Sequence, residues 1–245
     1  NTQTLSLIDL ITGNAGNQVA TDAENKFGIS KNQVIALLAV AAPLVISYLR
    51  KKSQENSSEA DALNNALDKD HDGSILNNPS QAVERQAEGN SILSHIFGGE
   101  KANVENQLSQ NTGISMDKIG PILAMLAPII MGYIGKEKQS NGVTSGGGLG
   151  DLLGGILGNA QNQAQSQPSN PLNDILGSVL GGGSNGQSAG NPLNDILGSV
   201  LGGGSQANSS GNPLTDILGS VLGGGQQNQQ QGGLGGLLGG ILGGK

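Results

Sequence analysis

Two long apolar runs dominate the first part of the chain, and each closely follows the tripeptide Gly-Ile-Ser. The runs are 34–49 and 119–134, and apolar side chains occupy nearly every position in them. A helix that is apolar on all sides is typically buried at the centre of a protein. We therefore expect two central core helices, each kinked or divided at its proline (Pro43 and Pro128), because proline lacks the N–H that a helical hydrogen bond requires.

Shorter amphipathic segments lie before and between these runs. Apolar residues recur at helical spacing, in most cases up to a closing glycine, in 5–12, 15–27, 60–67, 91–97 and 100–110. Ser30, followed three residues later by Gln33, has the spacing of a capping box at the start of a helix. The chain shows no sustained alternation of β-branched and polar residues. The sequence therefore predicts an all-α fold.

The two halves of this region repeat one pattern at a constant offset along the chain. At this offset Gly28 matches Gly113, Ala42-Pro43 matches Ala127-Pro128, and Tyr48 matches Tyr133. Such a long shared register indicates an internal duplication, and we expect two tandem copies of a small multi-helix unit packed as a pseudo-dimer. The expected organisation is copy 1 in 1–52, a linker with an aspartate-rich loop in 53–89, copy 2 in 90–138, and a low-complexity tail in 139–245.

The tail is rich in Gly, Ser, Asn and Gln, and three nearly identical units recur in it at a regular spacing. They are 170–180, 191–201 and 212–222, with degenerate copies at 149–157 and 234–242. In each of the three units an asparagine stands at the N-cap, a proline follows at the first helical position, and an aspartate lies in the first turn. Each unit is therefore predicted to form a short amphipathic helix.

The apolar face of each unit is its candidate partner-binding surface. The residues concerned are Leu172, Ile175, Leu176, Val179, Leu180, Leu193, Ile196, Leu197, Val200, Leu201, Leu214, Ile217, Leu218, Val221 and Leu222. So short a helix is marginal alone in water, so each unit needs a neighbour, a partner groove or a membrane surface. The polar side lacks the Lys and Arg that membrane-lying helices carry, which favours a protein partner or self-association. The alternative is a low-complexity tail that merely tolerates leucine.

One segment of the linker has the arrangement of a calcium-binding loop. Asp68, Asp70 and Asp72 occupy positions 1, 3 and 5, a glycine stands at 6, and Ser74 offers its carbonyl at 7. Position 12, which normally supplies a bidentate acid, is Pro79. The sequence therefore predicts weak, structural calcium binding, and the alternative is a solvated turn between two helices.

Composition and charge limit the function classes. The formal net charge of −7 argues against a nucleic-acid binder, which would hold phosphates with Lys and Arg. The chain has no cysteine and only two histidines; His71, inside the aspartate loop, is expected to be solvated, and His95 to have a surface or packing role. Because no nucleophile constellation, zinc spacing or phosphate loop is present, we do not expect an enzyme.

The apolar runs also raise the question of a membrane. Both are shorter than the stretch of about 20 residues that a helix needs to span a bilayer. Buried core helices are the favoured interpretation, and membrane association through these runs or the tail units is the alternative. No signal peptide is visible, so a cytoplasmic location is expected, with a secreted or envelope-associated protein as the alternative.

Several of these motifs together resemble a known family. They are the stretch 7–13 (Leu-Ile-Asp-Leu-Ile-Thr-Gly), the Ala-Pro pair in each apolar run, the segment 68–76 (Asp-Lys-Asp-His-Asp-Gly-Ser-Ile-Leu), and the Gly/Leu-rich tail. The chain resembles the bacterial family of unknown function numbered 937, which is related to the YidB-like proteins, over about residues 4–138. The resemblance implies a small all-helical bacterial protein with no established reaction.

The leading hypothesis is a non-enzymatic structural or interaction protein. In this hypothesis a helical body carries a multivalent tail that self-associates into a homo-oligomer or binds a protein partner. A membrane-associated protein and a weak calcium-binding module are the alternatives.

Overall fold

The computed structural model describes residues 5–166 and, beyond them, six single apolar residues of the tail. These six are Leu172, Ile175, Leu176, Val179, Leu193 and Leu197. Throughout this part of the chain the regular structure is helical, which confirms the predicted all-α class. The α-helices are α1 (Leu7–Thr12), α2 (Asn14–Phe27), α3 (Lys31–Glu55), α4 (Ser57–Lys69), α5 (Gln81–Glu84), α6 (Gln86–Phe97), α7 (Lys101–Thr112), α8 (Met116–Ser140) and α9 (Leu149–Ser166).

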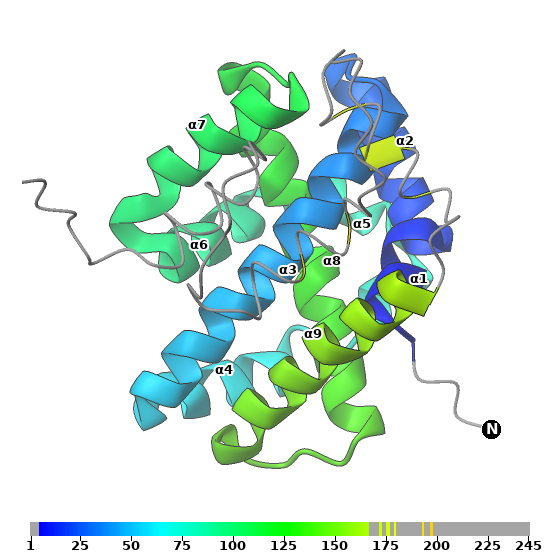
Figure 1. Ribbon diagram of the computed structural model, residues 1–245. Coiled ribbons are helices and arrows are strands. Elements are labelled where there is room, and N and C mark those ends of the chain that lie inside the picture. The colour runs from blue at the N-terminus through cyan, green and yellow to red at the C-terminus, as the bar shows by residue number, and fades with distance from the viewer. Residues whose placement is uncertain are drawn as a thin grey trace, which may run out of the picture.

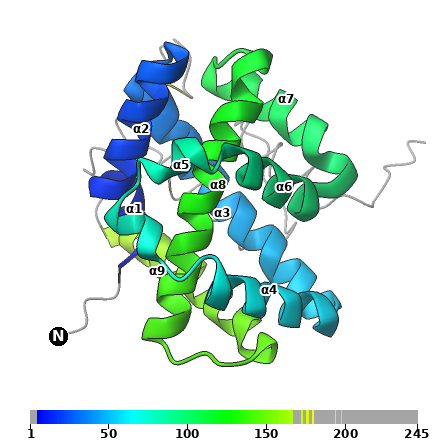
Figure 2. The same ribbon diagram turned by 180° about the vertical axis from the view of Figure 1, so that it is seen from behind.

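Helices α3 and α8 form the centre of the molecule, and the other helices pack around them. Figures 1 and 2, which view the molecule from opposite sides, show α3 nearer one face and α8 nearer the other. Each of the two helices is 25 residues long. Almost all side chains are buried from Val34 to Leu49 in α3 and from Ile122 to Ile134 in α8. Burial on every side explains why neither run shows the polar stripe of a surface helix.

The start of α3 follows the predicted capping box. The Ser30 hydroxyl accepts the Gln33 backbone N–H at 3.2 Å, and the Gln33 side chain returns to the Ser30 N–H. The preceding turn needs a left-handed residue, Gly28, with a φ of 69°. Gly113 takes the equivalent conformation, with a φ of 72°, before α8. The bounds of α3 and α8 therefore keep the constant offset of the sequence repeat.

The prolines do not divide the central helices. Pro43 lies inside a continuous α3, and Pro121 and Pro128 lie inside a continuous α8, so of the two expectations, a kink or a division, the division is wrong. A proline inside a helix costs about 3 kcal/mol because one hydrogen bond is lost and the ring crowds the preceding turn. Burial of the apolar residues on both sides of each proline outweighs this cost.

The same two helices have the length and hydropathy of membrane spans. For α3, 78% of the most apolar 18-residue window is buried inside the protein, and for α8 the share is 83%. Core helices of soluble proteins satisfy the same criterion, so this property is weak evidence for a membrane. Packing against neighbouring helices accounts for the apolar character of both.

Helix α9 continues the ordered structure into the region predicted as tail. It packs mainly against α3, and Figure 1 shows it running beside the second half of α3. Added Cβ atoms at Gly150 and Gly154 would lie 3.4 Å from Gln54 and 3.2 Å from Arg50, respectively, so the two helices run antiparallel. The buried residues of α9 are Leu149, Leu153, Ile156, Leu157, Ala160 and Ala164.

Candidate functional site

The candidate partner-binding residues that the structure describes are buried against the helical body. Leu172, Leu176, Leu193 and Leu197 are 0–1% exposed and belong to the hydrophobic core. Ile175 and Val179 are partly buried and pack against that core. These six residues come from the first two repeat units, and each has helical backbone conformation. These apolar residues of the two units thus belong to the same hydrophobic cluster as the core helices.

The other candidate residues of the tail lie outside the described part of the chain. They are Leu180, Ile196, Val200 and Leu201 of the first two units, and Leu214, Ile217, Leu218, Val221 and Leu222 of the third.

The aspartate loop begins in the last turn of α4, and its three carboxylates have separate surroundings. Asp68 forms an ion pair with Lys138 of α8, whose side chain is 3% exposed. The backbone N–H of Asp70 caps the end of α4. Asp72 accepts the Ser74 backbone N–H at 2.9 Å, and hydrogen bonds from Ser74 lower the pKa of Asp72. Across the described residues, no three His, Cys, Asp or Glu side chains are grouped to hold a metal ion, and calcium binding stays a prediction.

The aspartate loop packs against two glycines of α8, Gly132 and Gly135. A Cβ at Gly135 would overlap the carbonyl oxygen of His71, and a Cβ at Gly132 would lie 2.5 Å from Ile75 Cγ2. Gly73 of the loop, with a φ of 95°, also lies close to α8, because a Cβ added to it would be 2.8 Å from Lys136 Cβ. The loop therefore packs directly on the backbone of a core helix.

This close packing buries His71, which the sequence had suggested to be solvated. The histidine is 5% exposed, and its Nε2 lies 3.3 Å from Glu88 Oε1 of α6. Burial lowers the pKa of His71, because the charged ring loses hydration; Glu88, Asp70 and Asp72 act in the opposite direction, and Arg85 adds to the decrease.

Acidification should destabilise the protein through His71. Below its ordinary pKa of 6.5 the ring binds a proton in the unfolded chain but not in the folded protein, so the free energy of unfolding decreases as the pH falls. The variant His71→Gln should show a shallower pH dependence between pH 7.5 and 5.5, by up to about 1.4 kcal/mol per pH unit, the limit for one proton. Urea unfolding followed by circular dichroism at several pH values measures this slope.

His95 provides the matched control. Its side chain is 65% exposed rather than buried, so His95→Gln should keep a steeper pH dependence than His71→Gln. Equal slopes for the two variants would contradict the assignment to His71.

Both histidines line one pocket, of about 280 Å³, which lies beside α3 and between α4 and α6. Its wall is mostly aliphatic and comes from four helices: Leu49 of α3, Ala62, Leu63 and Ala66 of α4, Ile92 and Ile96 of α6, and Met131 of α8. Its polar residues are Lys52, Ser53, Glu59, His71, Ser91 and His95. The sequence analysis missed this pocket because its walls come from widely separated parts of the chain, from Leu49 to Met131.

Polar side chains connect the helices on the two sides of the pocket. Lys52 Nζ of α3 donates to the His95 carbonyl oxygen of α6 at 2.6 Å. His95 Nε2 lies 3.0 Å from Glu59 Oε2 of α4. At the inner end, His71 Nδ1 is buried and has no hydrogen-bond partner among the described residues. Three helices thus meet at one polar rim around an aliphatic interior.

Comparison with known proteins identifies a family but no function. A family model described as bacterial protein of unknown function (DUF937) matches residues 9–137. No curated protein and no solved structure matches the chain.

Proposed function

The chain belongs to this bacterial family of unknown function, and we propose that it is a non-enzymatic interaction protein whose helical body binds the repeat units of its tail. The observation that supports this proposal is the burial of Leu172, Leu176, Leu193 and Leu197 against the body. Burial of a leucine side chain contributes about 2 kcal/mol, so an otherwise marginal short helix gains stability only on such a surface.

Repetition makes this interaction multivalent. The first two units, 170–180 and 191–201, are identical in sequence, and the third differs only by Thr215. A body surface that accepts a unit from its own chain would present the same apolar residues to a unit from a second copy. Glycine-rich spacers link the units and give each a high effective concentration near any body that holds its neighbour. We expect exchange of units between copies, and hence homo-oligomers.

The pseudo-duplication belongs to the same proposal. We infer that α1–α3 and α6–α8 are tandem copies of one unit, followed by a Gly-rich tail of short amphipathic helices. The equal lengths of α3 and α8, and the left-handed glycines Gly28 and Gly113 before them, support this inference. Two related halves would offer two related surfaces to nearly identical units.

Size-exclusion chromatography with light scattering tests the proposal. The full chain should form species whose mass increases with concentration, whereas residues 1–166, which keep α9 but lack the three units, should keep one low mass. If both proteins keep the same low mass at every concentration, the tail does not assemble the protein.

A peptide of residues 191–201 should bind the 1–166 protein saturably, as measured by fluorescence polarisation. Replacement of Leu193 and Leu197 by Asp should abolish binding, because both leucines are buried in the docked unit. Replacement of Asn194 and Ser199 by Asp adds the same charge on the polar side and should leave binding unchanged. Equal binding of the two variant peptides would overturn the proposed face.

A further inference from the structure

We propose that the pocket between α4 and α6 binds a medium-chain aliphatic carboxylate, with its chain against the aliphatic wall and its carboxylate at Lys52. This site is separate from the surface proposed to bind the tail units, because none of the described tail residues lines it.

The volume of the pocket sets the length of the ligand. A cavity of about 150 Å³ lined by aliphatic and aromatic side chains holds benzene, which has six carbon atoms. The pocket measures about 280 Å³. By proportion it takes up to about eleven non-hydrogen atoms, which leaves room for an eight-carbon carboxylic acid with about ten.

The wall favours a flexible chain over an aromatic ring. Leu49, Leu63, Ile92 and Ile96 supply branched aliphatic surface from three helices, and Met131 supplies an unbranched, adaptable side chain from α8. Apart from the two histidines, the described lining has no ring on which an aromatic ligand could stack. Transfer of each methylene group from water to such a wall gains about 0.8 kcal/mol.

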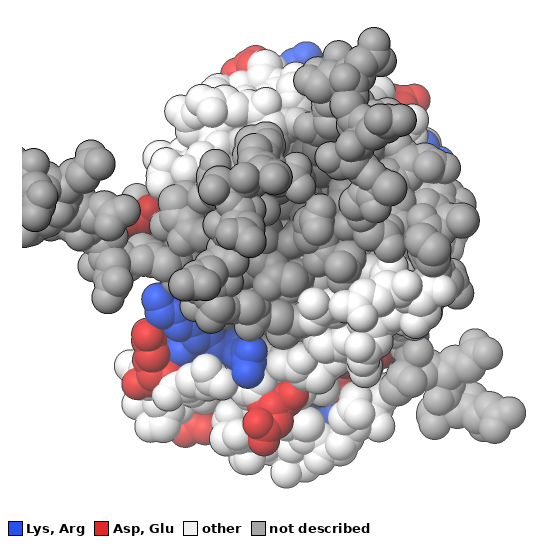
Figure 3. All heavy atoms as spheres, viewed as in Figure 1, with Lys and Arg blue, Asp and Glu red and all other residues white. Residues whose placement is uncertain are grey.

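The rim favours an anionic head group. Lys52 uses one ammonium donor on the His95 carbonyl oxygen at 2.6 Å, which holds the side chain at the pocket and leaves further donors. Lys52 belongs to the basic sequence 50–52 near the end of α3, and Figure 3 shows basic side chains beside acidic ones at the lower left of that view. Glu59 is the one acidic residue of the described lining, and its Oε2 is already engaged by His95 Nε2 at 3.0 Å.

Octanoate is the probe, and isothermal titration of the full-length protein is the measurement. Octanoate should bind saturably at one site per chain. Octylamine, which places a positive charge at Lys52, should show no saturable binding, and 1-octanol should bind at least about tenfold more weakly, since a hydrogen bond to a charged group is lost. Absence of saturable octanoate binding at millimolar concentration, or equal affinity for octanol, would overturn the proposal.

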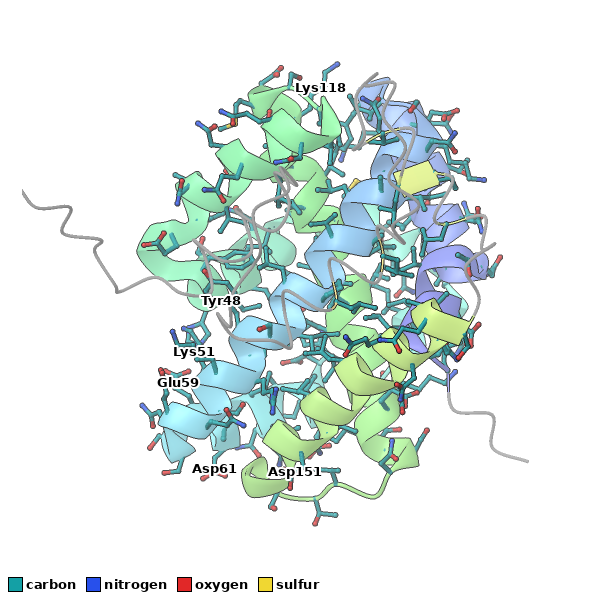
Figure 4. All side chains as sticks on the ribbon, viewed as in Figure 1. Tyr48, Lys51, Glu59, Asp61, Lys118 and Asp151 are labelled. Carbon is teal, nitrogen blue, oxygen red and sulfur yellow. The ribbon has the colours of Figure 1, made fainter. Side chains whose placement is uncertain are left out.

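Two pairs of variants locate the site. Lys52→Gln should weaken octanoate binding about tenfold. Lys118→Gln removes the same charge at a position that Figure 4 shows well away from Lys51, the neighbour of Lys52, and should not change binding. Ala66→Leu fills the pocket and should abolish binding, whereas Ala102→Leu, at an exposed position of α7, should not. Unchanged affinity in Lys52→Gln or Ala66→Leu would place the ligand elsewhere.

Discussion

Replacement of Gly89 by alanine should lower the free energy of unfolding by about 3 kcal/mol, the upper part of the range for overpacked cores. Gly89 lies in α6 where this helix crosses α8, and a Cβ there would overlap the Ala124 carbonyl oxygen. Helices α6 and α8 make the most extensive helix–helix contact among the described elements. A backbone atom cannot rotate away as a side chain can, so the two helices must separate.

Gly158 in α9 is the matched control for this change. No atom lies within 4 Å of a Cβ added at Gly158, so Gly158→Ala should add the helical preference of alanine and stabilise the protein by up to about 1 kcal/mol. Urea unfolding followed by far-ultraviolet circular dichroism measures both variants. If Gly89→Ala is neutral, the close approach of α6 to α8 is incorrect.

Local signals in the sequence predicted the helices well. The Ser30 and Gln33 capping box was visible from residue types and spacing alone, and the hydrogen bonds confirm it. The apolar runs marked both core helices for the same reason, because burial on all sides leaves no polar stripe. Proline was the exception. The hydrogen bond lost at Pro43 disfavours the helix locally, but α3 continues through Pro43 because residues far away in the sequence pack around it.

Long-range packing could not be predicted from the same signals. His71 has polar neighbours in the sequence, so local reasoning left it in solvent; its burial depends on Gly132 and Gly135, which lie far along the chain in α8. Those two glycines, spaced by three in an otherwise apolar helix, were the available signal, because such positions let another backbone approach closely. The two glycines did not indicate which segment of the chain would pack against them.

Helix α9 shows the same limit for the tail. Glycine-rich composition suggested only a short degenerate unit at 149–157, yet the helix spans Leu149–Ser166. Each helical glycine costs about 1 kcal/mol relative to alanine, so local propensity disfavours this helix. Gly150 and Gly154 instead allow close contact with α3, and burial of the leucine face provides the stability. Tertiary packing, rather than propensity, determines the length of α9.

Removal of α9 should therefore have a large effect. Residues 1–166 should unfold cooperatively, whereas residues 1–138 should aggregate or lose cooperative unfolding, because the α3 face beneath α9 becomes exposed. Contiguous apolar patches above a few hundred Å² promote association. Thermal unfolding and light scattering distinguish the two proteins. If 1–138 stays monodisperse and melts as 1–166 does, α9 contributes nothing to the body.

A pair of substitutions in the full-length chain isolates the same contact without truncation. Leu153 is 0% exposed, so Leu153→Asp should lower the free energy of unfolding by at least about 3 kcal/mol, since a leucine is lost from the core and a charge is buried. Gly155→Asp adds the same charge at an exposed position where a Cβ meets nothing within 4 Å, and should change stability by less than about 1 kcal/mol. Loss of stability only in Leu153→Asp would assign to α9 the role of covering α3. Helix α9 would then be part of the body to which we propose that the repeat units bind.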